Sequence, residues 1–262
     1  MGVNISFSLI QNTFAQSTFF MRKFFLFVFI VFAGVAATAQ SDSTVSRKVL
    51  KPGNLPRSND HFMFQVGYTM WNGQPDSINT GGIPRTFNGY FLFDFPFKTN
   101  PHWSAALGVG VGTDNVYFDK TNVGIKDLTG RIVFDDRSDT AHFKKYKLAT
   151  TYLEAPLELR YSSRPDDNKK SVKAALGIKV GILANAHTKG NTLEDKNGTT
   201  LNDYKVKEYS KQFFNKNRIA ATGRIGYGHF SIFGSYSITT LFKEGLGPTV
   251  RPLTIGLTLS GL

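Results

Sequence analysis

The chain has 262 residues, with 31 lysines and arginines against 19 aspartates and glutamates, and it contains no cysteine. The net charge of +12 favours a protein that meets anionic surfaces such as lipid head groups. The lack of cysteine excludes disulfides as the means of holding an exported fold together. No basic stripe interleaved with aromatic residues occurs on a recognisable nucleic-acid module, so nucleic acid is not an expected partner.

The first predicted element is a secretory leader. A basic head, Met21-Arg22-Lys23, precedes an unbroken apolar run over 24–36 and a small-residue cleavage pattern, Ala37-Thr38-Ala39. This order is typical of a signal peptide, and the apolar run is shorter than the roughly 18 to 20 residues that a membrane-spanning helix needs. We therefore predict a signal peptide over 1–39, with Met21 as an alternative translation start. A polar periplasmic segment over 40–60 is expected to follow it.

Eight runs of alternating apolar and polar residues come next. In the fifth run, for example, Val172, Leu176 and Ile178 alternate with Lys173 and Lys179. A period of two over such lengths predicts β-strands with two chemically different faces. The predicted strands cover 61–71, 88–98, 102–117, 146–161, 171–186, 217–227, 229–239 and 250–260.

The connections between these runs alternate in length. Three are short, at 99–101, 162–170 and Gly228, whereas those near 72–87, 118–145, 187–216 and 240–249 are mostly long and polar. Outer-membrane barrels have short periplasmic turns and long extracellular loops, and an even strand number returns both termini to the short-turn side. The sequence therefore predicts an all-β protein, an eight-stranded antiparallel up-and-down transmembrane β-barrel over 61–262.

A soluble lipid-binding barrel would also alternate, with its polar face in water. A water-facing surface should be rich in lysine and glutamate, yet the polar face here is mainly Gly, Ala, Ser and Thr, which suit a narrow interior. We therefore predict that the apolar face meets lipid. Six aromatic residues on that face lie beside the short turns, where a girdle at the membrane interface is expected: Phe62, Phe97, Trp103, Tyr161, Tyr227 and Phe230.

The polar face carries scattered charges. An eight-stranded barrel is just wide enough for side chains to fill it, so charges inside it need partners. We predict a lumen charge network that plugs the barrel, with Glu158 opposite or diagonal to Lys173 and Glu154 near Lys179. Pro156 removes one hydrogen bond from the sheet. The predicted network comprises Asp94, Glu154, Glu158, Arg160, Lys173, Lys179, Arg218 and Arg224.

Several segments resemble the PorT-like outer-membrane β-barrel family. They are TTYLEAPLELRY, KAALGIKVGILA, HFSIFGSYSITTLF and RPLTIGLTLSGL, together with a leader that ends in Ala-Gln. The resemblance covers nearly all of the chain after the leader, and it implies an outer-membrane location and possible service to a protein secretion system. Such barrels often end in an aromatic residue, whereas this chain ends in Ser260-Gly261-Leu262. The expected partners are outer-membrane lipids including anionic lipopolysaccharide, the outer-membrane insertion machinery and secretion-system proteins.

Catalytic signals are weak. His142 and His187 lie near the rims of the two longest connections, so a lipid-modifying enzyme is one candidate function. No Gly-x-Ser-x-Gly, His-Glu-x-x-His or phosphate-loop motif occurs. We therefore expect no catalytic site, no metal and no cofactor, and a non-enzymatic scaffold that acts through the loops over 118–145 and 187–216. A secretion-system accessory and a small porin are two further functions that such a barrel could have.

Overall fold

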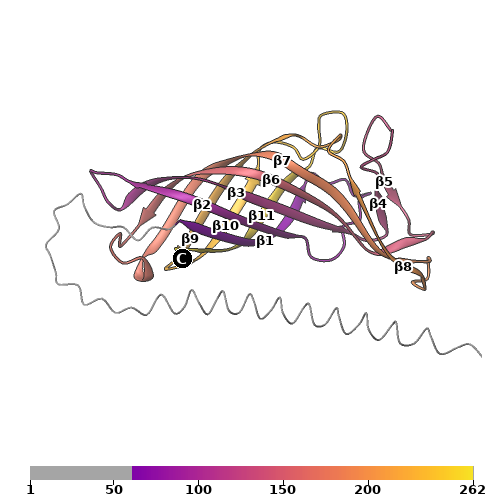
Figure 1. Cartoon of the computed structure of the whole chain (residues 1–262), viewed down its shortest axis with the longest axis horizontal. Helices are drawn as coiled ribbons and strands as arrows, with labels where there is room; N and C mark the ends of the chain where they lie inside the picture. Colours follow the sequence, from indigo (N-terminus) through magenta and orange to yellow (C-terminus); the bar gives the residue numbers. More distant parts are fainter. Residues whose placement is uncertain (1–60, 262) are drawn as a thin grey trace, which may run out of the picture. The chain divides into compact units, whose positions relative to one another are not determined.

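In the computed structural model, which describes residues 61–261, eight long antiparallel strands close into a barrel (Figure 1). Each strand pairs with its neighbour in the ring, and β1 pairs with β11 to close it. This confirms the predicted fold. The expected signal peptide, the alternative start at Met21 and the segment 40–60 lie outside the described residues. The barrel strands are β1 (Phe62–Asn72), β2 (Arg85–Pro96), β3 (Trp103–Phe118), β6 (His142–Ser162), β7 (Val172–Glu194), β9 (Asn217–Tyr227), β10 (Phe230–Ser237) and β11 (Arg251–Ser260).

The long connections contain strands that the sequence did not predict. β7 extends beyond the barrel and pairs there with β8 (Thr200–Tyr209), while β4 (Thr121–Val123) pairs with β5 (Phe134–Asp136). Figure 1 shows all three at the same end of the barrel. β8 was not predicted from the sequence. Because this strand has no buried face, its residues follow no apolar period. No helix in the described part of the chain is long and apolar enough to cross a membrane.

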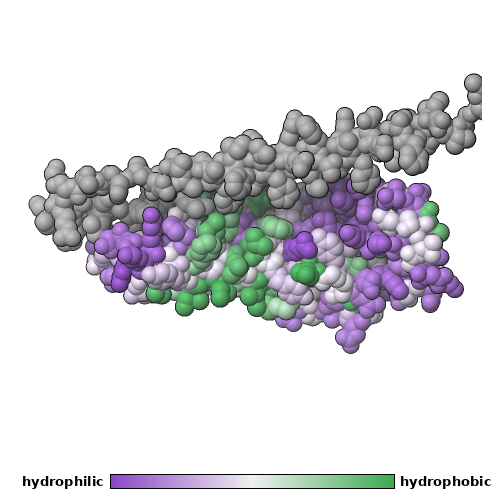
Figure 2. All heavy atoms as spheres, turned by 90° about the horizontal axis from the view of Figure 1, so that it is seen from below, coloured by the Kyte–Doolittle hydropathy of each residue, from purple (hydrophilic) through white to green (hydrophobic). Residues whose placement is uncertain are grey.

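The outer surface of the barrel carries an apolar belt. Figure 2 shows it as a green band between two hydrophilic ends. The belt includes Leu107, Val109, Leu157, Leu176 and Ile225, all of them exposed. The six aromatic residues of the expected girdle are also exposed, and they lie at or beside the strand ends nearest the short turns.

The register between β6 and β7 differs from the expected one. Glu158 lies opposite Gly177, and Lys173 lies opposite Ser162, so the expected placement of Lys173 opposite or diagonal to Glu158 is wrong. A hairpin's register follows from its turn. Here the turn contains a short 3-10 helix, η2 (Asn168–Lys170), which sequence alternation does not predict.

Pro156 lies at a break in the sheet. β3 pairs with β6 up to Leu107 and Leu157 and resumes at Gly110 and Glu154, so Pro156 falls within the gap. Because proline has no N–H to donate, this gap is where the residue is tolerated in the wall of a barrel.

Candidate functional site

The lumen contains an ionic cluster toward the short-turn end, here called the lower cluster. Glu158 Oε2 accepts hydrogen bonds from Arg160 Nε at 2.9 Å and from Arg224 Nη2 at 3.1 Å. Arg160 Nη1 also lies 3.7 Å from Asp94 Oδ1, and Ser104 Oγ donates to that same oxygen at 2.7 Å. One buried carboxylate therefore holds two buried guanidinium groups, which come from β6 and β9.

A second cluster, here called the upper cluster, lies further toward the long loops. Glu154 Oε1 is 2.6 Å from Arg218 Nη2, and Glu154 Oε2 is 3.3 Å from Lys179 Nζ. Tyr90 donates its hydroxyl hydrogen to Glu154 Oε2 at 2.5 Å. Arg218 also forms an ion pair with Asp114. Glu154 and Lys179 are each only 4% exposed, so this cluster is removed from water.

The structure places all eight sequence-selected charges on the inner face of the barrel. Its ion pairs join Asp94, Glu158, Arg160 and Arg224 in one cluster, and they join Glu154, Lys179 and Arg218 in the second. Lys173 is also buried.

Sequence reasoning missed three members of the upper cluster. Asp114 and Tyr90 both lie on the polar phase of their strands, which was a usable signal. Tyr152 was not selected either, and its ring lies 4.4 Å from the Arg218 guanidinium. Among residues 61–261, the barrel strands thus place four carboxylates and five bases in the lumen: Asp94, Asp114, Glu154 and Glu158 against Arg160, Lys173, Lys179, Arg218 and Arg224.

Glycines let this network fill the lumen. A Cβ atom added at Gly112 would lie 2.6 Å from Glu154 Oε2, and one at Gly110 would lie 2.6 Å from a ring carbon of Tyr90. Both distances are too short for real side chains. The glycine face of β3 therefore packs directly against the upper cluster.

An apolar cap lies above the network. All four long connections contribute buried residues to it, among them Ile78, Ile125, Phe214 and Phe242. Trp71 of β1 packs edge-on against Phe242, with ring centroids 5.9 Å apart. The long connections thus fold inward over the barrel end, with their own hydrophobic core.

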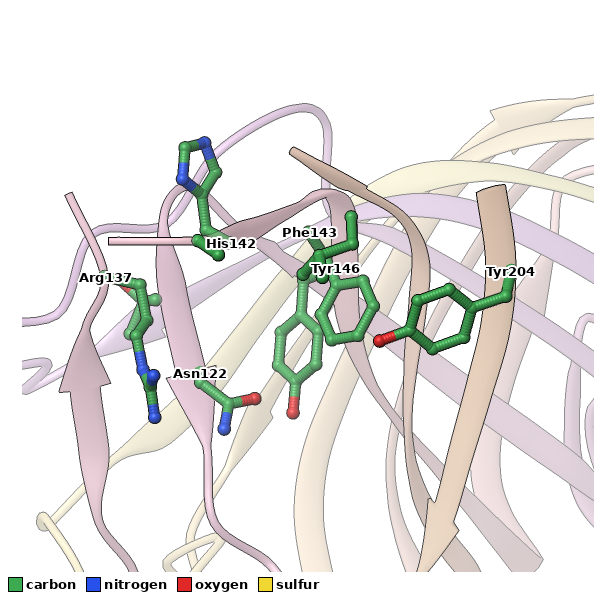
Figure 3. Close-up of a pocket in the computed structure, with 9 residues that line it drawn as sticks. Asn122, Arg137, His142, Phe143, Tyr146 and Tyr204 are labelled. Atoms are coloured by element: carbon green, nitrogen blue, oxygen red, sulfur yellow. The ribbon is translucent and has the colours of Figure 1, made fainter. Parts of the chain in front are cut away.

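A pocket of about 200 Å³ opens beside this cap (Figure 3). One wall is aromatic: Phe143 stacks on Tyr146 at 5.9 Å and meets Tyr204 of β8 edge-on at 5.9 Å. Figure 3 shows Asn122 and Arg137 on the opposite side from Tyr204. The pocket therefore offers both flat apolar surface and hydrogen-bond donors.

The two candidate histidines lie apart in the sheet. His142 pairs with Glu194 across β6 and β7, and its ring Nδ1 donates a hydrogen bond to Thr140 O at 3.1 Å. His187 pairs with Ala149 instead, and its ring packs against Tyr209. In the described part of the chain no cluster of acids and histidines could hold a metal ion.

An eight-stranded barrel with an apolar outer belt and an ionic interior defines a membrane-spanning β-barrel protein. The outer membrane protein beta-barrel domain matches residues 39–245, and the chain belongs to that family. It is therefore a protein of the outer membrane. No curated protein sequence matches the chain.

Solved structures give distant likenesses. Ail, the attachment invasion locus protein of Yersinia pestis, in complex with the heparin analogue sucrose octasulfate, is 14% identical, with a TM-score of 0.32. The alignment covers 77% of this chain and 97% of Ail. A porin mutant of Rhodopseudomonas blastica is 7% identical, with a TM-score of 0.18, covering 77% of this chain and 98% of the porin.

Proposed function

We propose that this protein is a non-enzymatic outer-membrane scaffold with a closed lumen, which acts by binding partners through its long connections. The apolar cap carries this proposal, because all four long connections contribute buried residues to it. A conducting pore needs a water-filled path, whereas here an apolar cap lies over a lumen filled by two ionic clusters. A role as a small porin is therefore less well supported.

The geometry also favours binding over lipid chemistry. Catalysis by a histidine base needs a nucleophile within hydrogen-bond reach. Among the described residues, His142 donates to a backbone carbonyl, and the His187 ring contacts the side-chain amide of Asn185, at 3.5 Å. Neither contact supplies a hydroxyl or thiol nucleophile.

Partner binding is best supported at β8. It is the edge strand of the sheet, so one side of its backbone is open to a further strand. The same strand contributes Tyr204 to the pocket. Partner proteins of a secretion system, as the PorT-like resemblance implies, would fit this role, and so would other cell-surface proteins.

A photo-crosslinking amino acid at Tyr204 tests the proposal on intact cells. We expect a discrete, heavier protein adduct, because β8 would be at the partner interface. The matched control places the same amino acid at Ile225, in the apolar belt, where only lipid adducts are expected. If cells that grow normally give no protein adduct with the crosslinker at position 204, that result would contradict a loop-mediated scaffold.

A further inference from the structure

Lysines lie side by side on the outer face of the sheet above the apolar belt. Lys147 of β6 lies opposite Lys189 of β7, which lies opposite Lys207 of β8. One step further out, Lys145 and Lys205 flank Asn191 on the same face. Like charges directly opposite each other destabilise a sheet. This set is called the lysine patch: Lys145, Lys147, Lys189, Lys205 and Lys207.

The patch continues onto the neighbouring strands. Lys147 Nζ donates a hydrogen bond to Asn115 Oδ1 at 2.6 Å and lies 5.9 Å from the centroid of the Tyr117 ring. Arg85 of β2 lies opposite Asn115. This part of β6 lies beyond the belt, and burial together with Lys189, Lys207 and Arg85 lowers the pKa of Lys147.

Carboxylates do not balance this charge. Within residues 61–261, none of the five lysines forms an ion pair. β8 carries two acids: Glu208 lies opposite Thr188 and so shares its inward face, and Asp203 accepts a hydrogen bond from Thr192 Oγ1 at 2.7 Å. The patch is therefore a cationic surface that lacks a counterion from the described chain.

The height of the patch limits what can reach it. Lys147 precedes Leu153, the last belt residue on β6, by six positions (153 − 147), which is about 20 Å along a strand. With a strand tilt of roughly 40°, the patch stands about 15 Å above the belt. The polar layer of an ordinary bilayer is only about 5–8 Å thick on each side. Phosphates carried on a longer, sugar-based head group would reach it.

The belt below the patch also has room for a lipid chain. A hollow of about 720 Å³ opens there, where the pairing of β3 with β6 is interrupted. Its outer lining includes Val109, Val111, Leu153, Ala155 and Ile182. An acyl chain placed in this hollow would lie below the patch, on β6 and β7, which carry three of the five lysines.

We propose that the lysine patch binds the sugar-borne phosphate groups of an anionic glycolipid, lipopolysaccharide, in the outer leaflet. The attraction of each lysine for a charged membrane surface adds to that of its neighbours, so several lysines on one face bind an anionic head group together. This site depends on the long connections facing the cell exterior and does not depend on the closed lumen.

The test measures lipopolysaccharide binding to the purified protein in phosphatidylcholine vesicles. Removing three charges in Lys147→Gln, Lys189→Gln and Lys207→Gln together should weaken binding on the order of 100-fold. The matched control changes three exposed lysines elsewhere, Lys126, Lys196 and Lys211, to glutamine and should bind like the wild type. Each variant is first checked for the wild-type shift between heated and unheated samples on a denaturing gel.

Three further arms identify the ligand. The wild type should bind dephosphorylated lipopolysaccharide weakly, and neither phosphatidylglycerol vesicles nor inorganic phosphate should compete at matched phosphate concentration. Equal binding of dephosphorylated lipopolysaccharide would overturn the proposal. So would competition by phosphatidylglycerol, which would make ordinary phospholipid sufficient, or by inorganic phosphate, which would reveal a site for free anions. Equal affinity of the patch variant and the control would also overturn it.

Discussion

Replacing Glu158 with alanine is expected to lower the free energy of unfolding of the barrel by about 3–5 kcal/mol. The reason is that the Glu158 carboxylate holds both Arg160 and Arg224 inside the lumen, at 2.9 and 3.1 Å. Without it, two buried guanidinium groups lose their shared carboxylate. The measurement is equilibrium unfolding in urea of protein folded into lipid vesicles.

Two further variants test whether the stranded guanidinium groups cause the loss of stability in Glu158→Ala. Glu158→Ala combined with Arg224→Ala should recover part of the lost stability, because one stranded charge is then removed. Glu244→Ala is the surface control: this exposed carboxylate should change stability by no more than about 0.5 kcal/mol. A loss for Glu158→Ala no greater than that of Glu244→Ala would show that the lower cluster does not stabilise the barrel.

The second large effect is expected at Arg218, the base that bridges two carboxylates in the upper cluster. Arg218→Ala leaves Asp114 and Glu154 with Lys179 as their remaining basic neighbour in that cluster, and the ring of Tyr152 loses its cationic partner. We expect a loss of about 3–5 kcal/mol in the same unfolding experiment. Arg131→Ala, which removes an exposed loop arginine, should have little effect.

Arg218→Lys distinguishes charge from geometry. Lysine keeps the positive charge but lacks the planar fork that reaches Asp114 and Glu154 together and stacks on Tyr152. Its stability should therefore fall between those of the wild type and Arg218→Ala. If lysine restored full stability, the bridging geometry would be unimportant.

The strand faces were predictable because alternation with a period of two carries over directly from sequence to structure. The same phase that exposes Leu157 on the belt turns Glu158 into the lumen. It also points Asp114 inward, so this partner of Arg218 could have been found from the sequence. The inward or outward orientation of residues that follow this alternation could therefore be predicted from the sequence.

Registers and loops were not predictable in the same way. The placement of Lys173 opposite Ser162 depends on a turn that contains η2, whose geometry leaves no periodic signal. Ile78, Ile125 and Phe214 lie in polar connections without a sustained apolar period, and only their convergence in three dimensions makes a cap. Long-range packing of this kind follows no local rule.

Single-channel recording in planar bilayers tests the closed lumen most directly. With the ionic clusters and the apolar cap in place, the wild-type protein should insert without giving stable conductance steps, while the same preparation shows the folded band on an unheated denaturing gel. Large, stable open channels from the folded protein would contradict a closed lumen and would favour a small porin.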